Sequence, residues 1–308
     1  MSTARKIKKI LKSKPTIEGA GVHLKRAFGN YQVPLLDPFL LLDDFHSDNP
    51  DDYIKGFPWH PHRGIETITY MLNGEVEHGD SMGNKGIIHA GDIQWMTAGS
   101  GIIHQEMPKG REDGLMWGFQ LWANLPASHK MMDPRYRDIK IDSIPEIALE
   151  NGTKIKIICG NVNGAKGPVK DIMIDPEYLD ITVLPKSSFR HRVKTGHTVF
   201  AYVIEGAGYF DEVRDPYAYE VEGANYFDLN RDCLINNENL VIFDDGNEVS
   251  VSTVDKPVRF LLISGNPIGE PVAWYGPIVM NTQEELRTAF EEYRNGTFIK
   301  SFKGGRSL

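Results

Sequence analysis

The sequence predicts an all-β protein with a duplicated β domain and a single α-helix close to the C-terminus. Most of the chain consists of short β-prone segments separated by Gly, Pro, Asn and Asp, which is typical of sandwiches and barrels. Residues 199–206 resemble residues 68–74, because each segment is a strand that ends in a glycine turn, and this indicates an internal repeat. Apolar residues with sustained helical spacing occur only after residue 282.

The domain boundaries are predicted from length and from breaks in the apolar pattern. A chain of 308 residues exceeds the usual size of one domain, so we expect two. The first is expected over residues 1–130, followed by a linker over 131–145 in which no apolar period is sustained. The second is expected over residues 146–275, with a C-terminal helix and tail over 276–308.

Residues 67–72 form the clearest predicted strand of the first half, since β-branched, aromatic and apolar residues make it up. Asn73-Gly74 is the strongest short hairpin signal, and it predicts a second strand around residues 75–77. Three further strands are predicted at 86–89, 92–97 and 116–123.

The first fourteen residues are basic and contain no acidic side chain. A transit peptide or a nucleic-acid-binding arm would have this composition. We favour an edge strand, in which Ile7, Ile10 and Leu11 are half buried and the lysines discourage pairing with other chains.

The second half repeats the β pattern and then ends in a helix. Strands are predicted at 154–159, 179–184, 198–205 and 240–243. Thr282 stands three residues before Glu285, which is a capping-box arrangement. Apolar residues follow at helical spacing and Gly296 ends the pattern, so a helix is predicted between these points.

The composition excludes several classes of function. A formal charge of −8 and a pI near 5.7 argue against direct binding to nucleic acid or to an anionic membrane. No apolar run approaches the roughly 18 residues that a membrane span needs, and no signal-peptide core follows the basic start. Cys159 and Cys233 are far apart and form no CxxC motif, which favours a reducing cytoplasm over a disulfide-bonded secreted protein.

Two short pairs of polar residues indicate a metal site: His60-Pro61-His62 and His104-Gln105-Glu106. In each pair the residues are two apart, so both side chains lie on one face of a strand. Although a single histidine on a strand is more often structural, two such pairs can direct three imidazoles and one carboxylate at a common point. That donor set suits a divalent metal such as iron and leaves positions free for chemistry. Glu66, four residues after His62, is either a rival carboxylate ligand or an outer residue that orients an imidazole.

Other residues near these pairs have weaker signals. His78 with Asp80, and His89, could line the mouth of a pocket, but surface roles are favoured. Four large residues close to the ligands in sequence could form a dry pocket for an aromatic substrate, with ordinary core packing as the alternative: Phe57, Trp59, Trp95 and Met96.

The segments around the two pairs resemble the pirin family of the cupin superfamily. The resemblance covers nearly the whole chain, and its most specific motif is the run GDIQWMTAGSGIIHQEMP at residues 91–108. The other motifs are FPWHPHRG at 57–64, QLWANLP at 120–126 and YGPIVMNT at 275–282. The resemblance implies two antiparallel β-barrels face to face, a bicupin, with the metal site in the N-terminal barrel alone. It implies the ligands His60, His62, His104 and Glu106, and leaves Glu66 as an outer residue.

The resemblance also implies an activity. Members of the family are associated with quercetin 2,3-dioxygenase activity, in which a flavonol ring is opened and carbon monoxide is released. We therefore expect a flavonol and dioxygen as substrates, iron as the metal, and Glu106 as a ligand or as the general base for the substrate hydroxyl. Mn, Ni, Cu, Co or Zn would fit the same donors. The alternative is a metal-dependent regulatory protein that binds a protein partner, in the manner of a redox-sensing transcription cofactor.

Overall fold

The computed structural model describes residues 3–32, 35–222 and 231–300, and these form two compact units. Unit A contains residues 15–32, 38–141 and 268–300, and unit B contains residues 3–14, 35–37 and 142–267. Strands dominate both units, and α1 (Gln283–Arg294) is the single α-helix of the described residues. The predicted all-β class with one C-terminal helix is therefore confirmed. No helix in the described part of the chain is long and apolar enough to cross a membrane.

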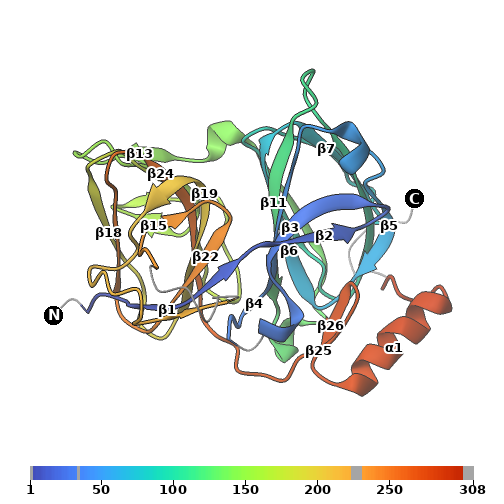
Figure 1. Cartoon of the computed structure of the whole chain (residues 1–308). Coiled ribbons are helices and arrows are strands. Elements are labelled where there is room, and N and C mark those ends of the chain that lie inside the picture. Colours follow the sequence, from blue (N-terminus) through green and yellow to red (C-terminus); the bar gives the residue numbers. More distant parts are fainter. Residues whose placement is uncertain (1–2, 33–34, 223–230, 301–308) are drawn as a thin grey trace. The chain divides into compact units, whose positions relative to one another are not determined.

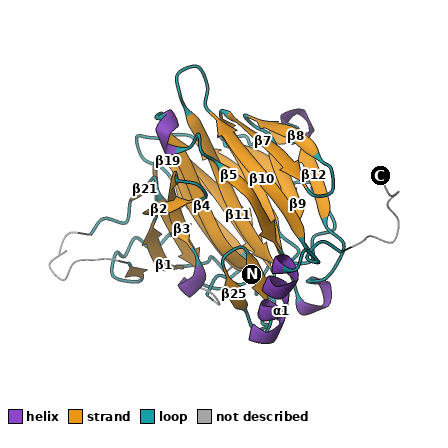
Figure 2. Ribbon diagram, turned by 90° about the vertical axis from the view of Figure 1, so that its right-hand side faces the viewer, coloured by secondary structure: helices purple, strands orange, loops and turns teal. Residues whose placement is uncertain are grey.

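Unit A is built on two antiparallel sheets (Figures 1 and 2). The seven-stranded sheet runs in the order β12 (Arg135–Ile139), β9 (Ile93–Thr97), β6 (Ile65–Asn73), β11 (Met116–Asn124), β4 (Phe39–Ser47), β3 (Val22–Phe28) and β2 (Lys14–Glu18). The four-stranded sheet runs in the order β5 (Phe57–His62), β10 (Ile102–Lys109), β7 (Glu75–Asp80) and β8 (Lys85–His89). The strands predicted in the first half all form, including the hairpin at Gly74, where φ is +75°.

Unit B has one large sheet and several short pairs of strands. The large sheet runs in the order β13 (Glu146–Ala148), β14 (Lys154–Cys159), β17 (Glu177–Val183), β24 (Val258–Gly265), β19 (Thr198–Gly208), β22 (Asn239–Phe243), β1 (Ile7–Lys12) and β20 (Glu220–Val221). The shorter strands are β15 (Asn161–Val162) with β16 (Ala165–Lys166), β18 (Ser188–Arg192) with β23 (Glu248–Ser252), and β21 (Ile235–Asn236) on β19. Apolar side chains such as Ile157, Leu179 and Phe260 form a continuous core in this unit.

Single turns of 3₁₀ helix in the described residues lie at Asn30–Gln32, Pro50–Asp52, Ala127–His129 and Ile141–Ser143.

The N-terminal segment belongs to a different unit from the one that the sequence predicted. Residues 3–14, expected in the first domain, belong to unit B, because β1 pairs with β22 from Lys12 opposite Asn239 to Ile7 opposite Phe243. Ile7, Ile10 and Leu11 are buried, and β1 lies between β22 and the two-residue β20, so it is flanked on both sides over part of its length. Pairing between residues more than 200 positions apart leaves no local signal in the sequence.

The C-terminal segment packs into unit A. Its hairpin, β25 (Ala273–Tyr275) and β26 (Ile278–Met280), lies beside α1 (Figure 1). The helix begins at the predicted capping box, where the Thr282 hydroxyl accepts from Glu285 N at 3.2 Å and the Glu285 carboxylate accepts from Thr282 N at 2.9 Å. Its apolar face, Leu286 and Ala289, packs on the hairpin.

Lys130 connects this hairpin to the turn between β5 and β6 through hydrogen bonds. Its buried ammonium group donates to Gly64 O at 2.9 Å, to Asn124 Oδ1 at 2.6 Å and to Val279 O at 3.1 Å. All three donor hydrogens are thus used, although burial lowers the pKa of Lys130 to about 7. The lysine therefore fixes β26 against the end of the strand that carries His60 and His62.

Candidate metal centre

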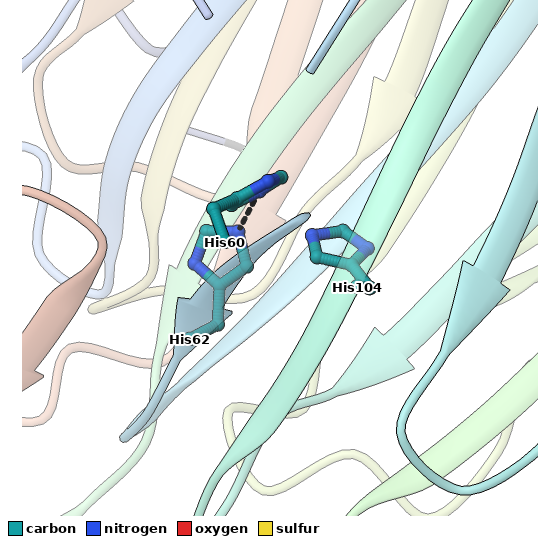
Figure 3. Close-up of side chains that lie close together, drawn as sticks. All are labelled: His60, His62 and His104. Atoms are coloured by element: carbon teal, nitrogen blue, oxygen red, sulfur yellow. Dashed lines mark hydrogen bonds between the residues drawn. The ribbon is translucent and has the colours of Figure 1, made fainter. Parts of the chain in front are cut away.

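Three of the predicted ligands converge inside unit A (Figure 3). His60 and His62 lie on β5, and His104 lies on the neighbouring β10, directly opposite His60 in the antiparallel register. The ring centroids are 4.4 Å apart for His60 and His104, 4.8 Å for His60 and His62, and 4.9 Å for His62 and His104. One nitrogen from each ring lies within 4.8 Å of the other two, which is the arrangement that a single metal ion requires.

Backbone carbonyls set the tautomers of two of these rings. His60 Nδ1 is 2.8 Å from Pro58 O, and His62 Nδ1 is 3.0 Å from Pro277 O. A carbonyl oxygen only accepts, so each Nδ1 carries the proton and each Nε2 presents a lone pair. The two Nε2 atoms are 3.1 Å apart, and two lone pairs at this distance repel unless a cation lies between them.

A metal ion is the cation that fits. Burial, followed by the charge of the neighbouring His60, holds the pKa of His62 well below its usual value, so a proton is a poor bridge. The pKa of His104 is also well below its usual value because the ring is fully buried among histidines. Neither nitrogen of His104 has a hydrogen-bond partner, and a metal bond would satisfy one of them. Neutral imidazoles are the form that binds a divalent metal.

Glu106 lies near the cluster but outside it. It follows His104 by two residues on β10, where a register shift against β5 brings it opposite Phe57. The carboxylate is buried, and its Oε1 is 3.1 Å from Thr69 Oγ1, which is also 2.6 Å from the side-chain oxygen of Gln120. A hydroxyl has one proton, so Thr69 cannot donate to both groups. When Thr69 donates to Glu106, the side-chain amide of Gln120 must be flipped so that its NH₂ group donates to Thr69 Oγ1. The carboxylate is not among the ligand atoms grouped within 4.8 Å.

The structure does not bring Glu66 to the imidazoles. Glu66 and Thr69 are three residues apart on β6, so their side chains lie on opposite faces, and Thr69 is the one that reaches Glu106. The Glu66 carboxylate accepts a hydrogen bond from Thr97 Oγ1 at 2.6 Å, and burial raises its pKa. The expected role of Glu66 in orienting an imidazole therefore has no hydrogen bond to support it among the described residues. The turn at Gly64 separates β5 from β6, so the four-residue spacing between His62 and Glu66 does not place their side chains on the same face of one strand.

A cavity of about 460 Å³ opens from the histidines into unit A. His60, His62 and Glu106 lie in its wall together with Thr69 and Gln120. The remaining wall is mainly apolar, with Val22, Leu24, Phe45, Phe57, Val76 and Met116.

Two tryptophans form another part of the wall and were not identified from the sequence. Trp122 packs edge-on against the His62 ring, with centroids 5.0 Å apart. The ring centroids of Trp122 and Trp274 are 6.0 Å apart. Of the four pocket residues expected from the sequence, Phe57 alone lines the cavity, whereas Trp59 is 53% exposed and Trp95 and Met96 are core residues. Trp274 comes from β25, so proximity in sequence could not reveal it.

His78 and Asp80 are buried, which corrects the surface role favoured from the sequence. They lie on β7, and the His78 ring is 5.4 Å from the His104 ring. Their two-residue spacing is the same as that of the two ligand pairs, and this signal could have identified them. His89 does lie at the surface, where it contacts Glu75.

Comparisons with known proteins agree with this architecture. The family model "Pirin" matches residues 21–123, and the model "Pirin C-terminal cupin domain" matches residues 178–299. A pirin-like protein of Caulobacter vibrioides is 41% identical over 295 residues, which are 96% of this chain and 99% of that protein. A Pseudomonas aeruginosa protein named "Putative quercetin 2,3-dioxygenase" is 38% identical over 300 residues, covering 96% and 99%. The crystal structure of a quercetin 2,3-dioxygenase from Acinetobacter baumannii has a TM-score of 0.83 at 31% identity and covers 96% of this chain and 99% of its own.

Proposed function

The chain belongs to the pirin family, and we propose that it is a metal-dependent dioxygenase that cleaves flavonols such as quercetin. The observation that carries the proposal is the cluster of three imidazoles, two of which lie in the wall of a mainly apolar cavity. Two similar proteins whose names include quercetin 2,3-dioxygenase support the choice of substrate. The cavity volume of about 460 Å³ lies within the range of about 300–1,000 Å³ that small-molecule sites occupy.

The proposed ligands are His60, His62, His104 and Glu106, with iron as the expected metal and Mn, Ni, Cu, Co or Zn compatible with the same donors. When bound, such an ion supplies a Lewis acid that lowers the pKa of a substrate hydroxyl, together with free coordination positions.

The protein's own residues would bind the substrate and move a proton. Trp122, Trp274 and the apolar wall around Phe45 and Met116 line the cavity and would suit a planar aromatic molecule. Glu106 would accept the proton of the flavonol 3-hydroxyl as general base. Because Thr69 occupies Oε1 of Glu106, the other carboxylate oxygen is the one for either role, so Glu106 would act as the base only when this oxygen is not bound to the ion.

The test is anaerobic reconstitution with iron(II), followed by quercetin and air-saturated buffer. We expect equimolar consumption of dioxygen and quercetin with release of carbon monoxide. Glu106→Gln preserves the shape of the side chain but removes its basicity, so kcat should fall by about 10²–10⁴-fold. His89→Ala, at an exposed position on β8, should leave kcat unchanged. Iron-loaded protein that consumes no dioxygen with any flavonol would contradict the proposal and favour the regulatory alternative, and so would normal turnover by Glu106→Gln.

A further inference from the structure

His104 lacks the outer hydrogen bond that the other two histidines of the cluster have. His60 and His62 each place Nδ1 against a backbone carbonyl, from Pro58 and Pro277. His104 is fully buried, and neither of its ring nitrogens has such a partner. Histidines that bind metals almost always donate their second nitrogen to a carboxylate, a carbonyl or water, because this fixes the tautomer and the ring orientation. In Figure 3 one ring nitrogen of His104 faces the other two histidines and the second faces away from them.

The neighbouring strand β7 supplies a polar pair next to His104. In the antiparallel register of β7 and β10, Asp80 lies opposite His104 and His78 lies opposite Glu106, so all four side chains share one face. His78 and Asp80 are 4% and 6% exposed. The centroids of the His78 and His104 rings are 5.4 Å apart, with an angle of 54° between the ring planes.

The tautomer of His78 follows from the contacts of Asp80. Asp80 Oδ1 accepts from the backbone N–H groups of Met82 at 2.9 Å and Asn84 at 3.0 Å, and Oδ2 accepts from the Asn84 side chain at 2.8 Å. Although burial opposes it, these bonds and the one from His78 hold the pKa of Asp80 below its usual value. An ionised carboxylate only accepts, so His78 Nε2, at 3.2 Å from Oδ2, must be the donor. In the neutral ring the buried Nδ1 of His78 then has a lone pair and no partner.

The donor that fits this lone pair is the Nδ1–H of His104. Tyr136 is stacked on the His78 ring at 4.8 Å with an interplanar angle of 27°, so its ring lies over the face of the imidazole and not at the ring edge where the lone pair points. We infer that Asp80 and His78 position His104 through one water between the two Nδ1 atoms, with the proton of His104 on Nδ1 and the lone pair of Nε2 directed at the metal. The inference rests on the proposed function in one respect, namely that His104 is a metal ligand.

Asp80→Asn tests the inference with little change in shape. The asparagine Oδ1 can still accept from Met82 and Asn84, but its NH₂ group cannot accept from His78 Nε2, so His78 must reverse its tautomer and lose the acceptor at Nδ1. With Co(II) as the probe, the dissociation constant should rise by about 10–100-fold, the usual effect of losing an outer partner of a metal ligand. The visible absorption bands of bound Co(II) should also shift, which a purely structural role of Asp80 would not cause. His78→Ala should weaken binding to a similar extent.

The control is His89→Ala, a surface histidine on β8 that contacts Glu75 and should leave Co(II) affinity and spectrum unchanged. Wild-type affinity and spectrum in both Asp80→Asn and His78→Ala would overturn the inference. If Asp80→Asn does not fold, His78→Ala decides, because it leaves the bonds of Asp80 to Met82 and Asn84 in place. Wild-type protein that binds no Co(II) would overturn both the metal centre and the inference. If Co(II) binding weakens as expected in the two variants but the iron-loaded wild-type protein oxidises no flavonol, the proposed function alone would be overturned.

Discussion

His104→Ala is expected to abolish stoichiometric metal binding. His104 is fully buried between His62 and His60 on one side and His78 on the other, and its replacement by alanine removes one of the three clustered nitrogens. Affinity should fall by more than the roughly 10–100-fold that follows loss of an outer partner, since a direct donor is removed. Elemental analysis after dialysis against metal-free buffer measures the effect.

The matched control for this variant is His191→Ala. His191 is also a buried histidine with an acidic neighbour, Glu177 at 2.7 Å, but it belongs to unit B. Its replacement should leave the metal content unchanged. Retention of a full equivalent of metal by His104→Ala would show that the ion is bound elsewhere.

Gly64→Ala is expected to have the largest effect on stability. Gly64 has a φ of +78°, and a Cβ atom there would lie 1.9 Å from Val279 O, one of the oxygens that Lys130 holds. The clash is with backbone, so β26 must move away from the β5–β6 turn. The free energy of unfolding should fall by about 3–5 kcal/mol, in the upper range for single substitutions. Metal affinity should fall as well, because the displaced segment includes Pro277, whose carbonyl accepts from His62.

Gly83→Ala separates the clash from the backbone effect. Gly83 has a φ of +89° and no atom within 4 Å of the added Cβ, so it should cost only the left-handed conformation, about 1–2 kcal/mol. Urea denaturation of both variants measures the difference. Equal losses in the two would mean that the contact between Gly64 and Val279 does not limit stability.

The strand alternation at the site could be predicted from the sequence, but the partners across the strands could not. The two-residue spacing within His60-Pro61-His62 placed both imidazoles on one face, and the structure confirms this. The register that puts His104 opposite His60 depends on the pairing of β10 with β5, and no local pattern specifies it. The same limit applies to Trp274, which reaches the cavity from a segment 150 or more residues away from the ligands.

The surface role expected for His78 and Asp80 is wrong, and the orienting role expected for Glu66 stays a prediction that no hydrogen bond among the described residues supports. Glu66 was related to His62 by spacing alone, although Gly64, with a φ of +78°, turns the chain between them. His78 and Asp80 have the same alternation as the ligand pairs, yet surface roles were favoured for them, and the structure buries both. Alternation within a single strand is therefore the more reliable guide to which polar residues share a site.

The central claim is that one metal ion is bound by the histidines of unit A. Anomalous diffraction from crystals of the iron-reconstituted protein, recorded on both sides of the iron absorption edge, tests it most directly. We predict a single strong anomalous peak about 2.0–2.2 Å from one nitrogen of each of His60, His62 and His104 and from one carboxylate oxygen of Glu106. A peak at any other position, or no peak between the three rings in protein that contains iron, would contradict the account.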